Sequence, residues 1–165
     1  MIVLHYTGMP DADGAIDRLT SPEARLSAHY VVKEDGEILQ LVDEDMRAWH
    51  AGKSYWRGIT DVNSASVGIE IVNPGHEFGY RAFPDEQIAS VIPLVADIKE
   101  RYGIGRGNVV GHSDIAPGAQ GGSGRVVPVG RARQPPPGLA QPDARSDGPV
   151  LDRRRLPARA RAVRL

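Results

Sequence analysis

The sequence lacks features that would point to several classes of protein. It contains no cysteine, which excludes a disulfide framework and leaves histidine, aspartate and glutamate as candidate metal ligands. No segment approaches the roughly 18 apolar residues of a membrane span. The N-terminus has no basic segment followed by a long apolar run, as an export signal would have. We therefore expect a protein without a membrane span, located in the cytoplasm.

Aromatic residues and core-forming patterns are missing from the end of the chain. The last aromatic residue is Tyr102, and seven of the 13 prolines follow Gly118. Residues 1–118 carry a net charge of −8, whereas residues 119–165 carry ten arginines and a net charge of +7. The second part cannot bury a core of its own. The sequence predicts one domain at 1–118 and an irregular, disordered tail at 119–165, which could bind an anionic partner or extend without one.

Apolar periodicity predicts several strands and one long helix in the first 118 residues. The helix is expected at 84–102, where apolar residues recur at helical spacing, and a shorter one at 11–19. Residues 34–36 form a turn between two alternating runs and indicate a β-hairpin. Residues 43–63 are loop-like. The strand-like runs are Met1–Tyr6, Ser27–Val32, Glu37–Val42, Ser66–Val72 and Asn108–Val110.

Three side chains at or near strand ends are candidates for chemistry. His5 and His112 each stand at the end of a short apolar run, a common way to direct an imidazole into a cleft. Taken alone, a histidine beside a turn is more often a structural hydrogen-bonding group than a ligand. Glu70 lies between two isoleucines, so strand alternation places it on the opposite face from both. If that face is the cleft of the histidines, Glu70 is a candidate general base.

Five ordered segments carry a resemblance to a known family: LHYTGM at 4–9, SAHYVV at 27–32, RAWHAG at 47–52, SVGIEIVNPG at 66–75 and GHSDIAPG at 111–118. Together they resemble the zinc-dependent N-acetylmuramoyl-L-alanine amidases of the peptidoglycan-recognition superfamily. The resemblance implies an α/β fold with a central mixed sheet flanked by helices. It also implies hydrolysis of the amide between N-acetylmuramic acid and L-alanine, with peptidoglycan or a muropeptide as partner rather than nucleic acid.

The resemblance also implies roles for individual residues. His5 and His112 match two zinc ligands, and Glu70 matches the catalytic glutamate, which takes a proton from the attacking water. The expected substrate-binding residues are Trp49, His50 and Asn73. For His50, contact with substrate and fixation of its own loop are both open interpretations.

Three further polar residues are interpreted as structural. We expect His29 to be hydrogen-bonded within the sheet and His76 to lie at the surface or at the rim of a groove. Asp114 stands two residues after His112 and could act as a metal ligand in place of the third one that the family has further along the chain. We expect it to cap a turn instead.

The chain departs from the family pattern directly after Gly118. There the family continues Arg-Lys-x-Asp-Pro-Gly, with the Lys as oxyanion cation and the Asp as third zinc ligand, but this chain has Gln120 and Gly122 at those positions. Suitable codons for the residues from Ala119 onward encode the missing motif in the neighbouring reading frame. We therefore hypothesise a single-nucleotide frameshift close to Gly118. As written, the chain is an amidase lacking two functional groups or a noncatalytic muropeptide-binding module.

Overall fold

The computed structural model describes residues 1–117, and the predicted tail at 119–165 lies outside the described residues. The described chain forms a five-stranded sheet with the order β3-β2-β4-β1-β5. β2 and β3 are antiparallel, whereas β4 is parallel to β2 and β1, and β1 is parallel to β5. The predicted mixed sheet and hairpin are thus confirmed. The strands are β1 (Ile2–Tyr6), β2 (Tyr30–Val32), β3 (Ile38–Gln40), β4 (Val67–Ile71) and β5 (Val109–Gly111).

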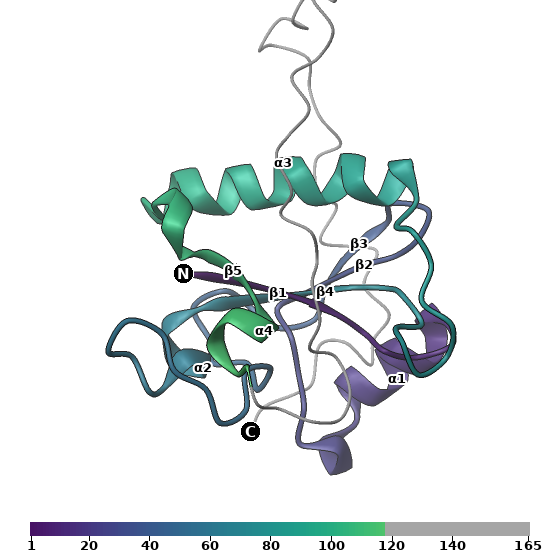
Figure 1. Ribbon diagram of the computed structural model, residues 1–165, viewed down its shortest axis with the longest axis horizontal. Coiled ribbons are helices and arrows are strands. Elements are labelled where there is room, and N and C mark those ends of the chain that lie inside the picture. Colours follow the sequence, from purple (N-terminus) through teal and green to yellow (C-terminus); the bar gives the residue numbers. More distant parts are fainter. Residues whose placement is uncertain (118–165) are drawn as a thin grey trace, which may run out of the picture.

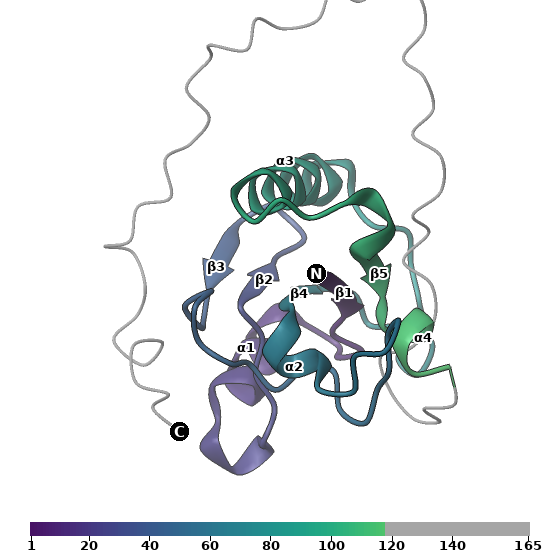
Figure 2. The same cartoon turned by 90° about the vertical axis from the view of Figure 1, so that its left-hand side faces the viewer.

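Helices lie on both faces of the sheet (Figures 1 and 2). The long helix α3 covers one face, and α1, α2 and α4 lie on the other side. The two predicted helices are present as α3 and α1, whereas α2 falls at the end of a stretch predicted to be a loop. The helices are α1 (Ala12–Thr20), α2 (Val62–Ala65), α3 (Asp85–Arg101) and α4 (His112–Ile115), with 3-10 turns at Pro22–Ala24 and Arg106–Asn108.

The alternation of side chains along β1 and β4 decides which residues face α3. Ile2, Leu4, Ile69 and Ile71 pack with residues of α3 in one buried cluster, whereas Val3 belongs to a different cluster. Because side chains alternate between the two faces of a strand, the side chain of His5 points away from α3. The same holds for Glu70, as the sequence predicts.

A glutamine on α3 holds the central strands where they end. Gln87 is fully buried, and its Nε2 donates to Val32 O at 3.0 Å and to Val72 O at 2.9 Å. Val32 is the last residue of β2 and Val72 directly follows β4. One side chain therefore ties α3 to the ends of two parallel strands. The end of β4 also carries Glu70, on the opposite face of the sheet.

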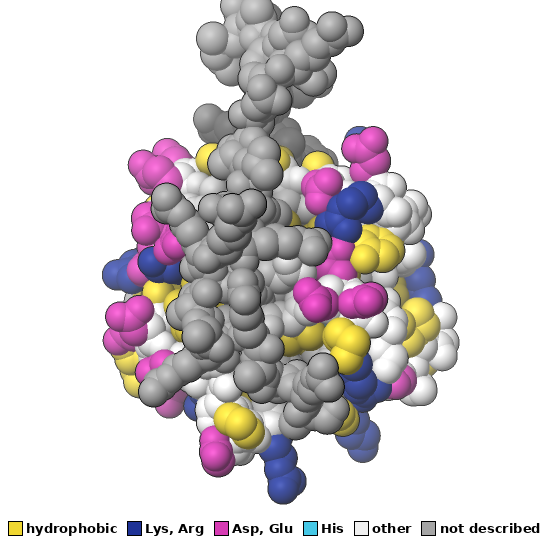
Figure 3. Space-filling view, turned by 180° about the vertical axis from the view of Figure 1, so that it is seen from behind, with side chains coloured by type: hydrophobic (Ala, Val, Ile, Leu, Met, Phe, Trp, Pro, Cys, Tyr) yellow, Lys and Arg dark blue, Asp and Glu magenta, His cyan; other side chains and the backbone are white. Residues whose placement is uncertain are grey.

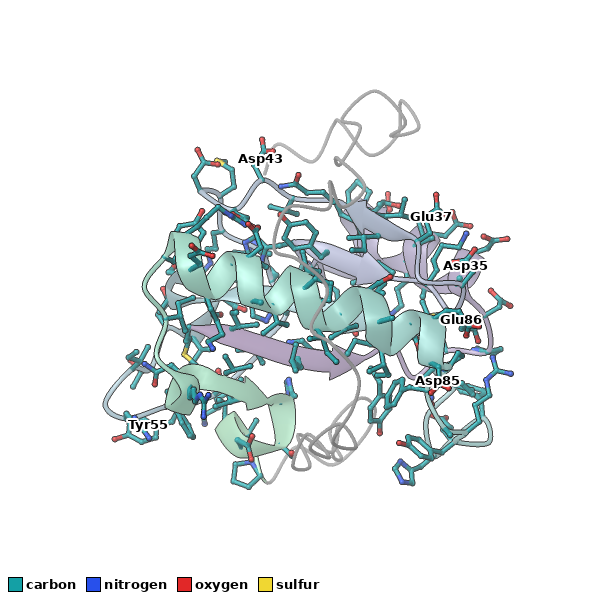
Figure 4. The ribbon with its side chains drawn as sticks, turned by 90° about the horizontal axis from the view of Figure 1, so that it is seen from above. Asp35, Glu37, Asp43, Tyr55, Asp85 and Glu86 are labelled. Carbon is teal, nitrogen blue, oxygen red and sulfur yellow. The ribbon has the colours of Figure 1, made fainter. Side chains whose placement is uncertain are left out.

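The β2-β3 turn packs against the first turn of α3. Gly36 has a φ of +83°, and a Cβ there would lie 2.8 Å from the carbonyl oxygen of Glu86, so glycine is required by both conformation and space. Figure 4 shows Asp35 and Glu37 of this turn beside Asp85 and Glu86 of α3.

The surface carries acidic side chains on many elements. In Figure 3 acidic groups, in magenta, lie among basic groups, in dark blue, on the face behind that of Figure 1; residues 1–118 carry a net charge of −8. Among the described residues, none of the helices combines the length and the apolar character needed to cross a membrane.

Candidate active site

The site is built where three parallel strands end. His5 is in β1, Glu70 is its Cα partner on β4, and His112 directly follows β5, whose Gly111 is paired with Leu4. The carboxyl ends of parallel strands lie at one edge of a sheet, where polar side chains from different strands can converge. His5 Nδ1 and His112 Nδ1 are 3.2 Å apart. Strand register therefore joins two histidines that are 107 residues apart in sequence.

A third histidine lies behind this pair. His50 Nδ1 is 3.0 Å from His5 Nε2, and the two rings meet edge to face with their centroids 5.1 Å apart. His50 Nε2 is 3.2 Å from Ser66 Oγ. The side chain of His50 is 4% exposed, so both of its ring nitrogens are occupied within the protein.

The loop that carries His50 is fastened to α2. Asn63 Oδ1 accepts hydrogen bonds from the backbone N–H groups of His50, at 3.0 Å, and Ala51, at 2.8 Å. Asp61 caps α2 through its side chain and also pairs with Arg47. Asn63 and Ser66 are site residues that sequence reasoning missed; the one local signal was the capping residue Asp61, which marks the start of a helix.

Burial keeps the histidines of this cluster uncharged. Burial lowers the pKa of His5 well below its usual range, and the neighbouring rings of His50 and His112 lower it further. Burial also lowers the pKa of His112 and, with neighbouring histidines, brings that of His50 to about 3. A neutral imidazole has one nitrogen lone pair free, which is the form that binds a metal.

Glu70 is a buried carboxyl group with an unused acceptor. It is 5% exposed, and its Oε2 has no hydrogen-bond partner among the described residues. Burial raises the pKa of Glu70 to about 8. The ionised form of a carboxyl group with a raised pKa is a stronger base than an ordinary carboxylate, which suits the role of a general base.

The pKa of Glu70 predicts a pH-dependent stability in the metal-free protein. The folded state binds this proton more tightly than the unfolded state does, so the stabilisation is complete below pH 4.5 and is lost as the pH rises through about 8. The histidines, whose pKa values are lowered, change the free energy of unfolding only below pH 6.5. From pH 6.5 to 8 the contribution of Glu70 to the free energy of unfolding should therefore fall by up to about 1.4 kcal/mol per pH unit, while the N-terminal amino group of Met1, whose pKa burial lowers, acts in the opposite direction.

Urea denaturation in the presence of a chelator measures this slope. Glu70→Gln should remove it, because the amide does not titrate. A slope of the same size in Glu70→Gln would show that another group causes the loss of stability.

Gly68 provides the space that His50 occupies. A Cβ added to Gly68 would lie 2.4 Å from His50 Cγ and 2.5 Å from its Cδ2, so Gly68→Ala should destabilise the protein by about 1–3 kcal/mol through overpacking. Gly105→Ala is the control, because its Cβ meets no atom within 4 Å. Equal effects of both substitutions on the free energy of unfolding in urea would refute the close approach.

Of the three residues predicted to bind substrate, one is exposed. Trp49 is 43% exposed, and the guanidinium carbon of Arg47 lies 4.3 Å from the centroid of its ring. Asn73 is 1% exposed; its Nδ2 donates to Arg81 O and its Oδ1 accepts from Gly75 N. Asn73 thus fixes the loop after β4, as Asn63 fixes the loop of His50. The structure places the side chains of His50 and Asn73 inside the protein.

The residues interpreted as structural have the expected partners. His29 is buried in the sheet, where its Nδ1 accepts from Gly68 N at 2.9 Å and its Nε2 bonds Met46 O at 3.0 Å. Asp114 Oδ2 accepts from Gly111 N at 2.8 Å, which is the predicted capping role. His76 is exposed and stacks on Tyr80.

The donor set suits zinc as far as the described residues extend. Two neutral imidazole nitrogens converge, and imidazole is a common zinc ligand. A catalytic zinc site uses three protein ligands, but within residues 1–117 no three or more histidine, aspartate or glutamate side chains form a group that could hold a metal ion. The position expected for the third ligand, Gly122, lies outside the described residues.

Comparison with known proteins places this site in a family. The family model described as N-acetylmuramoyl-L-alanine amidase matches residues 1–125. The amidase AmiD of Escherichia coli is 40% identical over 156 residues, which cover 87% of this chain and 55% of AmiD. The 1,6-anhydro-N-acetylmuramyl-L-alanine amidase AmpD of Enterobacter cloacae is 34% identical over 112 residues, covering 68% of this chain and 58% of AmpD. The chain thus spans little more than half the length of these relatives.

Solved structures give the same result. The complex of E. coli AmiD with the substrate anhydro-N-acetylmuramic acid-L-Ala-D-gamma-Glu-L-Lys has a TM-score of 0.64 and 41% identity, covering 71% of this chain and 49% of that one. Pseudomonas aeruginosa AmpDh3 in complex with anhydromuramic pentapeptide has a TM-score of 0.65 and 36% identity, covering 70% and 51%. The predicted type 2 amidase fold and the family resemblance are confirmed. The chain belongs to the N-acetylmuramoyl-L-alanine amidase family.

Proposed function

We propose that this chain acts on muropeptides as an amidase, hydrolysing the bond between N-acetylmuramic acid and L-alanine, with Zn²⁺ held by His5 and His112. The observation that carries the proposal is the 3.2 Å approach of the two Nδ1 atoms beside a buried carboxyl group on the neighbouring strand. Membership of the amidase family and the muropeptide complexes of AmiD and AmpDh3 support the substrate class.

The proposed chemistry divides between the metal and Glu70. When bound, zinc supplies a Lewis acid that polarises the amide carbonyl and lowers the pKa of water to about 7. Glu70 takes the proton of the attacking water and returns it to the nitrogen of the leaving alanine. Burial raises the pKa of Glu70 to about 8 in the metal-free chain, which makes its ionised form a stronger base for the first transfer.

The surrounding residues support this chemistry in different ways. Trp49, with Arg47 over its ring, offers an exposed aromatic surface on which an apolar sugar or peptide face can pack. His50 and Asn73 act from inside the protein, where they hold His5 and the loop after β4. Direct contact with substrate is therefore proposed for Trp49, and a supporting role for the other two.

A second candidate function follows from the replacement of the third zinc ligand in this sequence. Gln120 and Gly122 replace the lysine and aspartate of the family pattern, and neither can supply the oxyanion cation or a ligand. A chain that keeps its substrate-binding residues without a complete metal site would bind muropeptides and not cleave them. The frameshift hypothesis concerns the same residues, outside the described part of the chain, and resequencing of the gene tests it.

Release of L-alanyl peptide separates the two functions. The full chain is incubated with anhydro-N-acetylmuramic acid-peptide, with zinc and with chelator, and His5→Ala is the control. Zinc-dependent release that His5→Ala abolishes supports the amidase. Saturable binding without release supports the binding module, and the absence of both release and binding contradicts both functions.

A further inference from the structure

A chain of hydrogen bonds runs from helix α2 to His5. Its four groups are the carbonyl oxygen of Val62, the hydroxyl of Ser66, the ring of His50 and the ring of His5. The hydroxyl is 2.6 Å from Val62 O and 3.2 Å from His50 Nε2, and His50 Nδ1 is 3.0 Å from His5 Nε2. The remaining ring nitrogen of His5, Nδ1, lies 3.2 Å from His112 Nδ1.

If only the hydrogen bond between His5 and His50 is considered, two arrangements of protons are possible. Either His5 carries its proton on Nε2 and donates to His50, or His50 Nδ1 donates to His5 and His5 carries its proton on Nδ1. Each ring is neutral and so has a single N–H group. Only the first arrangement leaves His5 Nδ1 with a lone pair directed at the place where the two histidines converge.

Ser66 decides between the two arrangements. A carbonyl oxygen accepts and cannot donate, so the single hydroxyl proton of Ser66 must be directed at Val62 O. Toward His50 the same hydroxyl is then an acceptor, and His50 Nε2 must carry the proton. His50 Nδ1 is consequently bare and accepts from His5 Nε2–H.

We propose that His50 and Ser66 are positioning residues that fix the tautomer and orientation of His5, so that its Nδ1 lone pair points at His112. Ligating histidines commonly depend on such a partner for the second ring nitrogen. The inference rests on the proposed function only in naming zinc as the ion that His5 binds. The tautomer itself is a property of the metal-free chain.

The chain of hydrogen bonds has a rigid base. His50 is 4% exposed, so water does not compete for its ring nitrogens. Asn63, from the same helix, holds the backbone of His50, and Gly68 admits the ring against β4. Helix α2 therefore fixes both the backbone and the side chain of His50.

Nuclear magnetic resonance of the ring nitrogens in the metal-free full chain tests the proposal. Long-range ¹H–¹⁵N spectra at neutral pH distinguish the protonated nitrogen from the bare one. We expect His5 in a single form with the proton on Nε2. Ser66→Ala no longer holds the proton of His50 on Nε2, so both tautomers of His5 should be present. Ser66→Thr keeps the hydroxyl and should show the single form.

Ser27→Ala is the matched control. Ser27 is buried and its hydroxyl accepts from Trp49 N at 2.9 Å, so this variant loses one hydrogen bond to the same loop but none in the chain to His5. The spectra of Ser27→Ala should match those of the unchanged protein. A single Nε2–H form of His5 in Ser66→Ala, or a proton on Nδ1 in the unchanged protein, overturns the proposal.

Zinc titration separates this inference from the proposed function. Zinc affinity should fall about 10-fold in Ser66→Ala relative to Ser27→Ala. Equal affinities in the two variants would overturn the positioning role. If His5 has the expected tautomer but the unchanged chain binds no zinc, the proposed function fails while the fixation of His5 by His50 and Ser66 stands.

Discussion

Glu70→Gln is expected to slow the release of L-alanyl peptide by about 10²–10⁴-fold, the usual contribution of a general base. The amide has nearly the shape of the carboxyl group but cannot take a proton from water. Glu70 is buried, and its Oε2 has no partner among residues 1–117, so the substitution breaks no hydrogen bond at that atom. The variant should fold, and its zinc affinity should stay within about twofold of the unchanged chain, since Glu70 is not a proposed ligand.

The measurement is the initial rate of peptide release at equal zinc occupancy. Glu77→Gln is the matched control, because Glu77 is exposed on the loop after β4 and has no proposed role. Its rate should equal that of the unchanged chain. A Glu70→Gln variant that keeps the full rate would remove Glu70 from the proton transfer, and one that loses zinc would make it a ligand.

The second large effect is a gain of zinc binding. Gln120→Lys combined with Gly122→Asp restores the two groups that the family pattern has after Gly118. A carboxylate at 122 would add a third ligand to His5 and His112, and we expect zinc affinity to rise at least about 10-fold, since even indirect partners of a ligand are worth that much. Peptide release should rise with it, and Glu70→Gln in this background should abolish the gain.

Isothermal titration with Zn²⁺ measures the change in affinity. Gly121→Asp, which adds the same charge one position away, is the control and should not raise the affinity to the same extent. If the double variant binds zinc no better than the unchanged chain, the position assigned to the third ligand is wrong.

The sheet and the central residues of the site could be predicted from the sequence. Strand alternation placed Glu70 opposite its two isoleucine neighbours, and the structure has Ile69 and Ile71 under α3. The positions of His5 and His112 at strand ends, combined with the order of the family motifs, brought them together. The orientation of Glu70 follows from the period of a strand, which the local sequence determines, whereas the pairing of His5 with His112 is implied by the family resemblance.

The surroundings of His50 could not be predicted, because they depend on contacts between distant segments. Whether His50 faced substrate or held its loop was open in the sequence. The choice is made by Ser66 and Asn63, which hold its ring and its backbone, and by the absence of a side chain at Gly68. Helix α2 has only four residues, which are too few to show a helical period in the sequence.

Asn73 illustrates the same limit. The family resemblance assigns Asn73 to the substrate-binding residues, and in the structure its side chain bonds the backbone at Gly75 and Arg81. An asparagine that closes a loop and one that meets a ligand have the same sequence context, since both follow a strand and precede a turn. Burial distinguishes them, and burial is a property of the folded chain.

The most direct test of this account is the stoichiometry and affinity of zinc in His5→Ala and His112→Ala, with His76→Ala as an exposed histidine control. We expect one Zn²⁺ per unchanged chain, the same in His76→Ala, and loss of binding in each of the other two variants, because His5 and His112 hold the ion together. Zinc binding that survives the removal of either histidine would contradict it.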